Sequence, residues 1–530
     1  MKLIKFSVMT FVVFLCFAAC SEDSISVMPD ESIQASQEPL SSGEFAVGGS
    51  FGNDVSGNEN LGSQMGDVGG FSSGSEIPGN VVPGSGTSSS VPPDGGISGT
   101  EVPGGMSSGM EFSSSSVGIP GSSTSGNTFW GDDESDLDDA RTLTGAEILL
   151  KLSGTTATVE NNNGCVTVAE KSATITCPGA YYVTGESSDF QVVVNTPAAE
   201  GEENTGIYLH NATLKSQNAP ILVKNAKKTV LHLVKGTTNV VEDGNGNHLY
   251  EKVNGTQDTA KAAIYARDDL NIKGAGTLTV KGNFNNGIQC SNDLKIKNGN
   301  ITVEAKENGI KGKGSLEISG GTLNITAKAG DGLESDECEE APDGSCAKIV
   351  ENKGFVEISG GNITIKAGDD GIQAANYVLV SDSTEASTIK ITSTGKGLMA
   401  DKVIYVNGGT INVEAEDDGM HTHYQVYMNA GNVTVSTKDD GIHADSALYL
   451  RGSTVNVVTA YEGLEAYRIF AEGGVTSTYA TNDGWNAAGG PKENSGGYSM
   501  FSESSGHAVI SGGYHYIASK GDMIDVLDAN

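Results

Sequence analysis

The sequence has few basic residues, few cysteines and little long apolar sequence. It contains 32 lysines and arginines against 67 aspartates and glutamates, a formal net charge of −35 at pH 7. Such an excess of negative charge excludes nucleic acid and anionic membrane surfaces as expected partners. The two close pairs among the seven cysteines lack the spacing of a zinc site. The apolar run at 6–19 is too short to be a good membrane span.

Residues 1–20 have the layout of an export signal. Lys2 and Lys5 precede the apolar run, and Phe17-Ala18-Ala19-Cys20 ends it. This ending resembles a bacterial lipoprotein cleavage box, in which Cys20 would carry the lipid. Ser21 resembles the residue found there in proteins sent on to the outer membrane. We therefore expect a lipoprotein of the outer membrane or cell surface; an ordinary cleaved signal is the alternative.

Residues 21–141 contain almost nothing that could form a core. Serine, glycine, proline and scattered acidic residues dominate, as in Ser113-Ser114-Ser115-Ser116. Such a composition predicts a disordered linker. The remaining residues, 142–530, are expected to form one long domain.

A short corner centred on glycine recurs through this domain. Successive intervals from Gly287 are 22, 23, 39, 26, 22, 22, 22 and 21 residues. A fixed period near twenty residues is typical of a solenoid. The corner glycines are Gly287, Gly309, Gly332, Gly371, Gly397, Gly419, Gly441, Gly463 and Gly484.

Each unit between corners has the alternation of short strands. Ile404 and Val406, then Ile411, Val413 and Ala415, follow Gly397, and apolar or small residues recur at these offsets in the next units. Alternation with period two indicates strands with one buried face. Three short strands per 22-residue coil, without helical pattern, predict an all-β parallel β-helix. A horseshoe of leucine-rich repeats is disfavoured, because its asparagine ladder and helical segment are missing.

The cysteines fit an exported protein. Cys165 and Cys177 are twelve residues apart, and Cys338 and Cys346 are eight apart inside the longest interval. Both pairs are predicted to form disulfides in an oxidising compartment. Cys290 takes a slot that other coils fill with alanine, so we expect a buried, inert thiol.

Four blocks between residues 226 and 278, together with the corners, resemble a known family. The blocks are Ala226-Lys227-Lys228-Thr229-Val230, Lys235-Gly236-Thr237-Thr238-Asn239, Ala262-Ala263-Ile264-Tyr265-Ala266 and Asp269-Leu270-Asn271-Ile272-Lys273-Gly274-Ala275-Gly276-Thr277-Leu278. The chain is similar over 142–530 to bacterial carbohydrate-binding proteins of plant cell-wall degraders, which have a right-handed, polysaccharide-lyase-like β-helix. The resemblance implies calcium-assisted binding of cellulose or pectic polymer without clear catalysis.

Acidic residues gather around the corners. Equivalent positions of stacked coils lie about 4.8 Å apart, and two unit charges at about 5 Å repel by roughly 3 kcal/mol at a dielectric near 20. Calcium, which takes six to eight oxygen ligands, suits such a ladder. The alternative is a solvated edge whose aspartates bond backbone amides of the turn. The predicted calcium ligands are Asp331, Asp336, Asp369, Asp370, Asp417, Asp418, Asp439, Asp440, Asp445, Glu462 and Glu465.

Two details qualify this ladder. Lys396 replaces the corner acid of one coil and is expected to neutralise Asp370 and Asp418. His421, His443 and Asp445 offer imidazole ligands, which suit zinc or copper. Surface histidines beside acids are the plainer and preferred interpretation of these three.

Tyrosine recurs eight residues after three successive corners. Tyr405, Tyr427 and Tyr449 lie between inward-facing residues, so they are predicted to point outward and stack. Such a strip could take pyranose rings. Stacking that only stabilises the strands is the alternative.

Three functions compete. The first is a non-catalytic, monomeric surface lipoprotein that binds plant cell-wall polysaccharide, namely cellulose, pectic polygalacturonate or both, and meets the membrane only through its lipid. The second is a calcium-dependent pectate lyase, with Lys396, Lys402 or Arg451 as the base. The third is a structural adhesin. Fold analogy alone does not choose among them.

Replacing Cys20 by serine removes the residue that would carry the lipid. We expect the Cys20→Ser protein to accumulate uncleaved or to appear in soluble fractions, because a lipoprotein box needs its cysteine. Cell fractionation with immunoblotting checks this. Correct cleavage with full membrane retention would contradict the lipoprotein interpretation.

Overall fold

The computed structural model describes residues 143–199, 201–341, 346–383, 385–488, 506–526 and 528–529. The predicted signal, Cys20 and the linker at 21–141 lie outside the described residues. All regular secondary structure within the described ranges is β-strand. No helix among these residues is long and apolar enough to cross a membrane.

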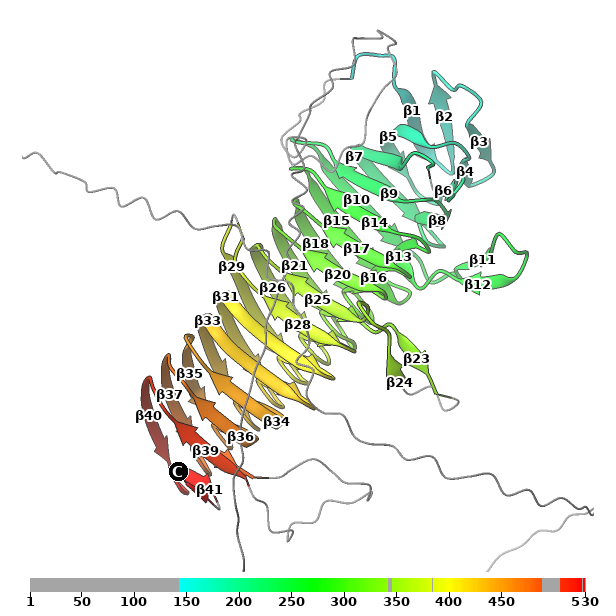
Figure 1. Cartoon of the computed structure of the whole chain (residues 1–530). Coiled ribbons are helices and arrows are strands. Elements are labelled where there is room, and N and C mark those ends of the chain that lie inside the picture. The colour runs from blue at the N-terminus through cyan, green and yellow to red at the C-terminus, as the bar shows by residue number, and fades with distance from the viewer. Residues whose placement is uncertain are drawn as a thin grey trace, which may run out of the picture. The chain divides into compact units, whose positions relative to one another are not determined.

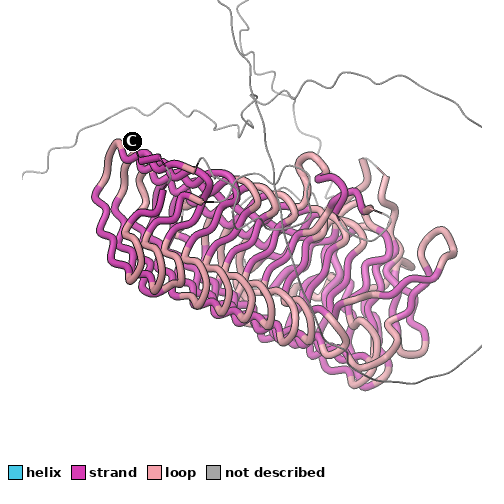
Figure 2. Tube along the Cα trace, turned by 90° about the horizontal axis from the view of Figure 1, so that it is seen from below, coloured by secondary structure: helices cyan, strands magenta, loops and turns pink. Residues whose placement is uncertain are grey.

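Most strands stack in parallel, each pairing with its equivalent one coil further along the chain. Within the described ranges, 38 strands join one continuous sheet, so each coil is hydrogen-bonded to the next along the whole stack. Figure 1 shows this succession from β5 to β40, and Figure 2 shows the turns of successive coils following one another. The prediction of an all-β, solenoid-like chain is confirmed.

Three columns of strands, called A, B and C, make up the stack. Column A begins at the corners and contains β4 (Ser172–Ile175), β6 (Gln191–Asn195), β8 (Ile221–Asn225), β13 (Ala262–Ala266), β16 (Asn286–Cys290), β19 (Ile310–Gly312), β22 (Leu333–Ser335), β27 (Ile372–Ala374), β30 (Leu398–Ala400), β32 (Met420–Thr422), the starts of β34 (Ile442–Leu450) and β36 (Leu464–Ala471), β38 (Trp485–Ala487) and β41 (Ile524–Val526).

Column B follows column A along each coil. It contains the starts of β5 (Gly179–Ser187) and β7 (Thr205–Ser216), β9 (Thr229–Leu233), β14 (Leu270–Lys273), β17 (Asp293–Ile296), β20 (Ser315–Ile318), β25 (Phe355–Ile358), β28 (Tyr377–Val380), the starts of β31 (Val403–Ala415) and β33 (Gln425–Ser436), the ends of β34 and β36, β39 (His507–Ile510) and β42 (Asp528–Ala529).

Column C closes each coil before the next corner. It contains the ends of β5 and β7, β10 (Thr238–Asp243), β15 (Thr277–Gly282), β18 (Asn300–Ala305), β21 (Thr322–Ala327), β26 (Gly361–Ala367), β29 (Ser387–Ser393), the ends of β31 and β33, β35 (Thr454–Thr459), β37 (Val475–Ala480) and β40 (Tyr514–Ser519).

Antiparallel pairs lie at the start of the stack and in two projecting hairpins. The first strands, β1 (Ile148–Gly154) and β2 (Thr156–Glu160), pair antiparallel, as do β3 (Val166–Ala169) and β4. The hairpins β11–β12 (Leu249–Glu251, Gln257–Thr259) and β23–β24 (Cys338–Glu340, Cys346–Ile349) project from the side of the coils in Figure 1. The second hairpin accounts for the 39-residue interval between corner glycines.

The core is a ladder of apolar side chains in one-coil register. Ile404 pairs with Val426, which pairs with Leu448, and all three are fully buried. Burying such side chains contributes roughly 1.5–3 kcal/mol each. The period-two alternation therefore specifies which face of each strand is buried, because a slip of one residue would expose the whole apolar set.

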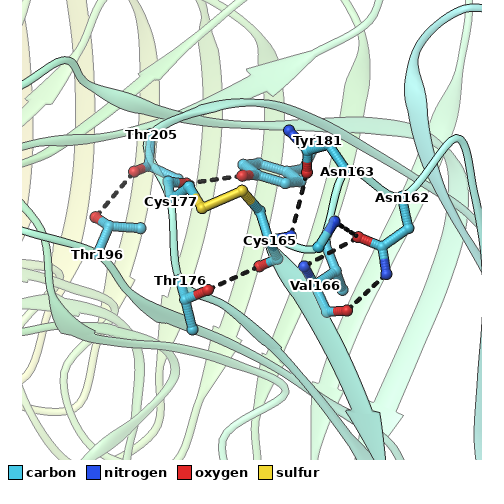
Figure 3. The surroundings of a disulfide bond; sticks show 10 residues. Asn162, Asn163, Cys165, Val166, Thr176, Cys177, Tyr181, Thr196 and Thr205 are labelled. Atoms are coloured by element: carbon cyan, nitrogen blue, oxygen red, sulfur yellow. Dashed lines mark hydrogen bonds between the residues drawn. A yellow bond between two sulfur atoms is a disulfide. The ribbon is translucent and has the colours of Figure 1, made fainter.

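The cysteines partly follow the predictions. Cys165 and Cys177 form a disulfide beside the β3–β4 pair, with Cα atoms 5.3 Å apart (Figure 3). Cys338 and Cys346 lie on paired strands β23 and β24. The side chain of Cys346 is outside the described residues, so that bond stays a prediction. Cys290 is fully buried as expected, and burial raises the pKa of its thiol to about 12.

The corner glycines are required by packing between coils. None of them has a positive φ. A Cβ atom on Gly419 would lie 2.3 Å from Cγ1 of Val435 and 2.5 Å from the carbonyl oxygen of Gly441. Equivalent conflicts occur at Gly371, Gly397 and Gly463. Glycine therefore recurs because the chain of the next coil passes too close for any side chain.

Alanine at Gly419 tests this packing requirement. We expect Gly419→Ala to lower the free energy of unfolding by about 1–3 kcal/mol, because the added methyl group meets backbone that cannot move freely. The shift of the urea midpoint measures the loss. Glu414→Ala, which truncates an exposed side chain of the preceding coil, is the control and should leave the midpoint almost unchanged. An equal midpoint for both variants would contradict the packing argument.

Candidate functional site

The corner aspartates bond from one coil to the next. One carboxylate oxygen of each accepts the backbone N–H of the equivalent residue in the following coil, so these side chains help to hold the coils together. The donor–acceptor distances are 3.0 Å for Asp370 N to Asp331 Oδ1, 2.6 Å for Lys396 N to Asp370 Oδ1, 3.1 Å for Asp440 N to Asp418 Oδ1 and 3.2 Å for Glu462 N to Asp440 Oδ1.

This bonding needs an oxygen atom but no negative charge. In two earlier coils the same position is asparagine, and the same bonds form. Asn286 Oδ1 accepts from Asn308 N at 3.0 Å, and Asn308 Oδ1 accepts from Asp331 N at 2.9 Å. The sequence also allowed an alternative in which the aspartates bond backbone amides of the turn. That alternative therefore applies to one oxygen of each side chain. The charge that begins at Asp331 needs a separate explanation.

The carboxylate at the first charged corner, that of Asp331, lies in an unfavourable environment for a negative charge. Asp331 is 6% exposed. Burial, followed by repulsion from Glu334 and Asp370, raises the pKa of Asp331 to about 8. The nearby Lys311 ammonium is shared by Glu334 at 2.8 Å and Asp336 at 2.6 Å. Asp336 is therefore held by a lysine, while Asp331 faces uncompensated negative charge.

A second acidic group lies at the corners of Gly419 and Gly441. Single oxygens of Asp417, Asp418 and Asp439 all lie within 4.8 Å of one another. Burial, followed by the charges of neighbouring aspartates, raises the pKa of Asp439. Three carboxylates with only oxygen donors fit calcium, which prefers such ligands and tolerates loose geometry. The structure thus brings these three predicted residues together.

Lys396 sits beside this acidic group. Its ammonium bonds to Asp417 and lies 4.0 Å from Asp418. Burial would lower the pKa of the Lys396 ammonium, but the bond to Asp417 and the charge of Asp418 outweigh burial and raise it. The expected pairing with Asp418 is present, whereas Asp370 receives the backbone N–H of Lys396.

Two further predicted acidic ligands, Glu462 and Asp445, have other partners. Both oxygens of Glu462 accept side-chain amides, from Asn482 at 3.1 Å and from Asn486 at 2.5 Å. Asp445 lies 3.2 Å from Nδ1 of His423, and burial is outweighed by two histidines that lower the pKa of Asp445. These residues do not join the oxygen-only group.

Two imidazoles lie side by side in adjacent coils on the outer face of column A, with their ring planes tilted by 53°. His421 pairs with His443, and His443 pairs with Glu465, in adjacent coils. The His421 and His443 ring centroids are 4.6 Å apart. Burial would lower the pKa of the His443 imidazole, but the surrounding carboxylates outweigh it and raise the pKa to about 11. The histidines therefore lie between two rows of carboxylates.

The predicted tyrosine stack is confirmed on column B. Ring centroids are 5.2 Å apart for Tyr405 and Tyr427 and 4.7 Å apart for Tyr427 and Tyr449. Phe470 continues the stack at 5.0 Å, and the Arg451 guanidinium lies over two of the tyrosine rings. Because the ring faces contact one another, this aromatic strip presents mainly ring edges and hydroxyl groups to a ligand.

A second surface, on column C, was not identified from the sequence. Two rows of outward-facing side chains run in register over eight strands from β15 to β35. With one exception, Lys390, they are threonine or asparagine. We call this surface the Thr/Asn face; its rows are Thr277, Asn300, Thr322, Asn362, Thr388, Thr410, Asn432 and Thr454, and Thr279, Thr302, Asn324, Thr364, Lys390, Asn412, Thr434 and Asn456.

The surroundings of the Thr/Asn face make it accessible. An open groove of about 490 Å³ runs beside it and is lined in part by Asn300, Thr322 and Asn362. At the other end the rows continue into Tyr514 and Tyr516, which are 81% and 67% exposed. The signal for this face was present in the sequence as a Thr/Asn pair, two residues apart, in each coil.

Neutralising Asp331 should stabilise the protein in a pH-dependent way. The pKa of this carboxyl rises from 3.8 to about 8 on folding, so the unfolded chain releases its proton first and stability falls as the pH rises between these values. Asp331→Asn keeps the accepting oxygen and removes the charge. We expect its gain in melting temperature to be small near the lower pH and to grow until about pH 8.

Thermal unfolding of both proteins across this pH range, in the presence of chelator, measures the effect. Glu304→Gln, which removes an exposed carboxylate from the preceding coil, is the control and should show no such trend. A gain for Asp331→Asn that does not change with pH would contradict the raised pKa.

Comparison with known proteins agrees with the sequence blocks described above. The family model of carbohydrate-binding domain-containing proteins matches residues 169–441 and 385–525. A carbohydrate-binding domain-containing protein of Acetivibrio thermocellus is 37% identical over 246 residues, covering 46% of this chain and 78% of that protein. A solved structure of a polysaccharide lyase-like protein from C. thermocellum, a gadolinium derivative, is 34% identical, covers 51% of this chain and 97% of that chain, and superposes with a TM-score of 0.41. The chain belongs to the family of carbohydrate-binding domain-containing proteins.

Proposed function

We propose that this protein binds plant cell-wall polysaccharide at the cell surface without cleaving it. Family membership supports carbohydrate as the ligand class. The observation that carries the proposal is the Thr/Asn face, a long, accessible and almost uncharged surface on a chain with a net charge of −35. A neutral polymer can lie on this face without removing water from a dense set of charged side chains, which would be costly elsewhere on the molecule.

The fold we propose is a right-handed parallel β-helix. Three parallel columns, each with one-coil register, support this assignment. Each coil contributes one strand to each column. The outward sides of the stacked strands therefore form a continuous surface along every column. The Thr/Asn face and the aromatic strip are then two sides of one rod.

Cellulose is the polymer that the Thr/Asn face suits best. Hydroxyl and amide side chains both donate and accept hydrogen bonds, which matches the hydroxyl groups of a glucan. The exposed rings of Tyr514 and Tyr516 add apolar area with a polar edge at the end of the rows. The aromatic strip, with its ring edges and Tyr449 beside Arg451, is a second surface for the same ligand class.

Polygalacturonate requires a different account, because it is anionic like the protein. Calcium would supply the positive charge that joins the two. Asp417, Asp418 and Asp439 form the oxygen-only set that would hold it. We propose Asp369 and Asp370 as a second set of calcium ligands. They lie beside Asp331, whose pKa is raised. Pectic binding should therefore depend on calcium, whereas cellulose binding should not.

The geometry gives little support to a lyase. A base that removes a sugar proton works best with a pKa near the working pH. The pKa of the Lys396 ammonium is raised, and its bond to Asp417 occupies it. The Arg451 guanidinium bonds to Glu472 at 2.8 Å and covers two tyrosine rings.

We propose cell-surface anchoring through Cys20 on the sequence of residues 1–20 alone.

A binding panel on cellulose, xylan and polygalacturonate, each with calcium or chelator, tests the proposal. Thr410→Glu combined with Thr434→Glu places two charges on the Thr/Asn face. We expect at least tenfold weaker cellulose binding, or about 1.4 kcal/mol. Lys402→Ala, an exposed change of the same coil at the turn between columns A and B, is the control and should bind cellulose like the parent. Tyr427→Ala shows separately whether the aromatic strip contributes.

The calcium arm uses Asp417→Asn combined with Asp439→Asn. This variant should weaken calcium-dependent polygalacturonate binding, because only the Asp369 and Asp370 set remains, and it should keep cellulose binding. An unsaturated uronide product absorbing in the ultraviolet would overturn the non-catalytic proposal. Absence of binding to every polymer would favour the structural adhesin instead.

A further inference from the structure

Three histidines and an aspartate converge where column A turns into column B. His421 and His443 occupy the same outward position of β32 and β34. Single ligand atoms of His421, His423 and Asp445 lie within 4.8 Å of one another. Nε2 of His443 lies 3.4 Å from Oδ1 of Asp445. Three potential ligands from two adjacent coils thus lie together on the surface, and His443 borders them through Asp445.

Buried carboxylates hold two of the rings from behind. Oδ2 of Asp418 lies 2.7 Å from Nδ1 of His421, and Oδ2 of Asp440 lies 3.5 Å from Nδ1 of His443. The two aspartate side chains are 5% and 9% exposed. A carboxylate on one ring nitrogen orients the imidazole, and a metal that binds the other nitrogen displaces the proton held there. Metal-ligating histidines usually have such a partner.

The donor set distinguishes this cluster from the acidic corner. Imidazole nitrogen suits zinc and copper, whereas calcium prefers carboxylate and carbonyl oxygen. Three histidines and one carboxylate are enough for the four-coordinate geometry of zinc. His423 and Asp445 are half exposed, with side-chain exposures of 50% and 43%, so an ion could enter from solvent.

We propose that His421, His423, His443 and Asp445 form a site for a first-row transition metal ion, with Zn²⁺ as its test ligand. Asp418 and Asp440 orient His421 and His443 from the buried side. The ion would join β32 to β34 and thereby tie two coils together. This site needs no sugar, and none of its four ligands belongs to the oxygen-only set; the two sites share only Asp418, which supports His421 from behind.

The alternative is that the same histidines and aspartates form ion pairs with one another and bind no metal. Ion pairs and metal binding differ in their response to Zn²⁺, so titration separates them. The chain should be treated with chelator, dialysed and titrated with Zn²⁺ by calorimetry, in parallel with Ca²⁺. We expect one Zn²⁺ bound per chain, a rise in melting temperature, and no displacement by a hundredfold excess of Ca²⁺.

Variants assign the site. His423→Ala combined with Asp445→Asn should weaken Zn²⁺ binding at least a hundredfold while the circular dichroism spectrum stays unchanged. Asp418→Asn keeps an oxygen that can accept the Asp440 N–H but removes the carboxylate behind His421, and it should weaken Zn²⁺ binding tenfold to a hundredfold. Asp417→Asn combined with Asp439→Asn is the matched control and should bind Zn²⁺ like the parent.

A spectroscopic measurement guards against binding elsewhere on the chain, which has eight histidines. Cu²⁺ bound at this site should show nitrogen coupling in electron paramagnetic resonance, and the His423 and Asp445 double variant should lose that signal. Undiminished Zn²⁺ affinity in the double variant, equal competition by Ca²⁺, or a copper spectrum with oxygen ligands only would each overturn the proposal.

Discussion

The structure depends on parallel pairing of each strand with its equivalent one coil away. Hydrogen bonds between neighbouring strands fix a spacing of about 4.8 Å, so any residue repeated every coil becomes a row of side chains in contact. Buried rows form the core, glycine rows let the chain pass closely, and outward rows become surfaces. Each candidate site described here is a row or a junction between rows. A shift in register would therefore disrupt core and sites together.

Features that repeat could be predicted from the sequence. The corners, the alternation of inward residues and the tyrosine stack follow from spacing, which parallel stacking translates directly into contact. The Cys165–Cys177 disulfide follows from the short separation of two cysteines, which flank the antiparallel β3–β4 pair. The Thr/Asn face repeats equally well and could have been found in the same way. It was overlooked because threonine and asparagine carry neither charge nor a large apolar group.

Features that depend on the direction in which a side chain points could not be predicted from the sequence. Spacing places Asp418 on the ladder but does not show that one oxygen bonds the next coil while the other meets His421. Nor does it show that Lys396 turns toward Asp417, or that tyrosine ring faces are used within the strip. These outcomes depend on side-chain rotamers and burial. The antiparallel β1–β2 pair also escaped prediction, because the repeat begins after it.

Near-repetition along the Thr/Asn face has a consequence for how a polymer would be held. A chain displaced by one coil meets almost the same two side chains again, since most coils from β15 to β35 present threonine or asparagine at both positions. Many bound positions are then nearly equal in energy, which adds favourable positional entropy to the complex. The free-energy barrier between neighbouring bound positions would be small, so the protein could move along a fibre in steps of one coil without dissociating.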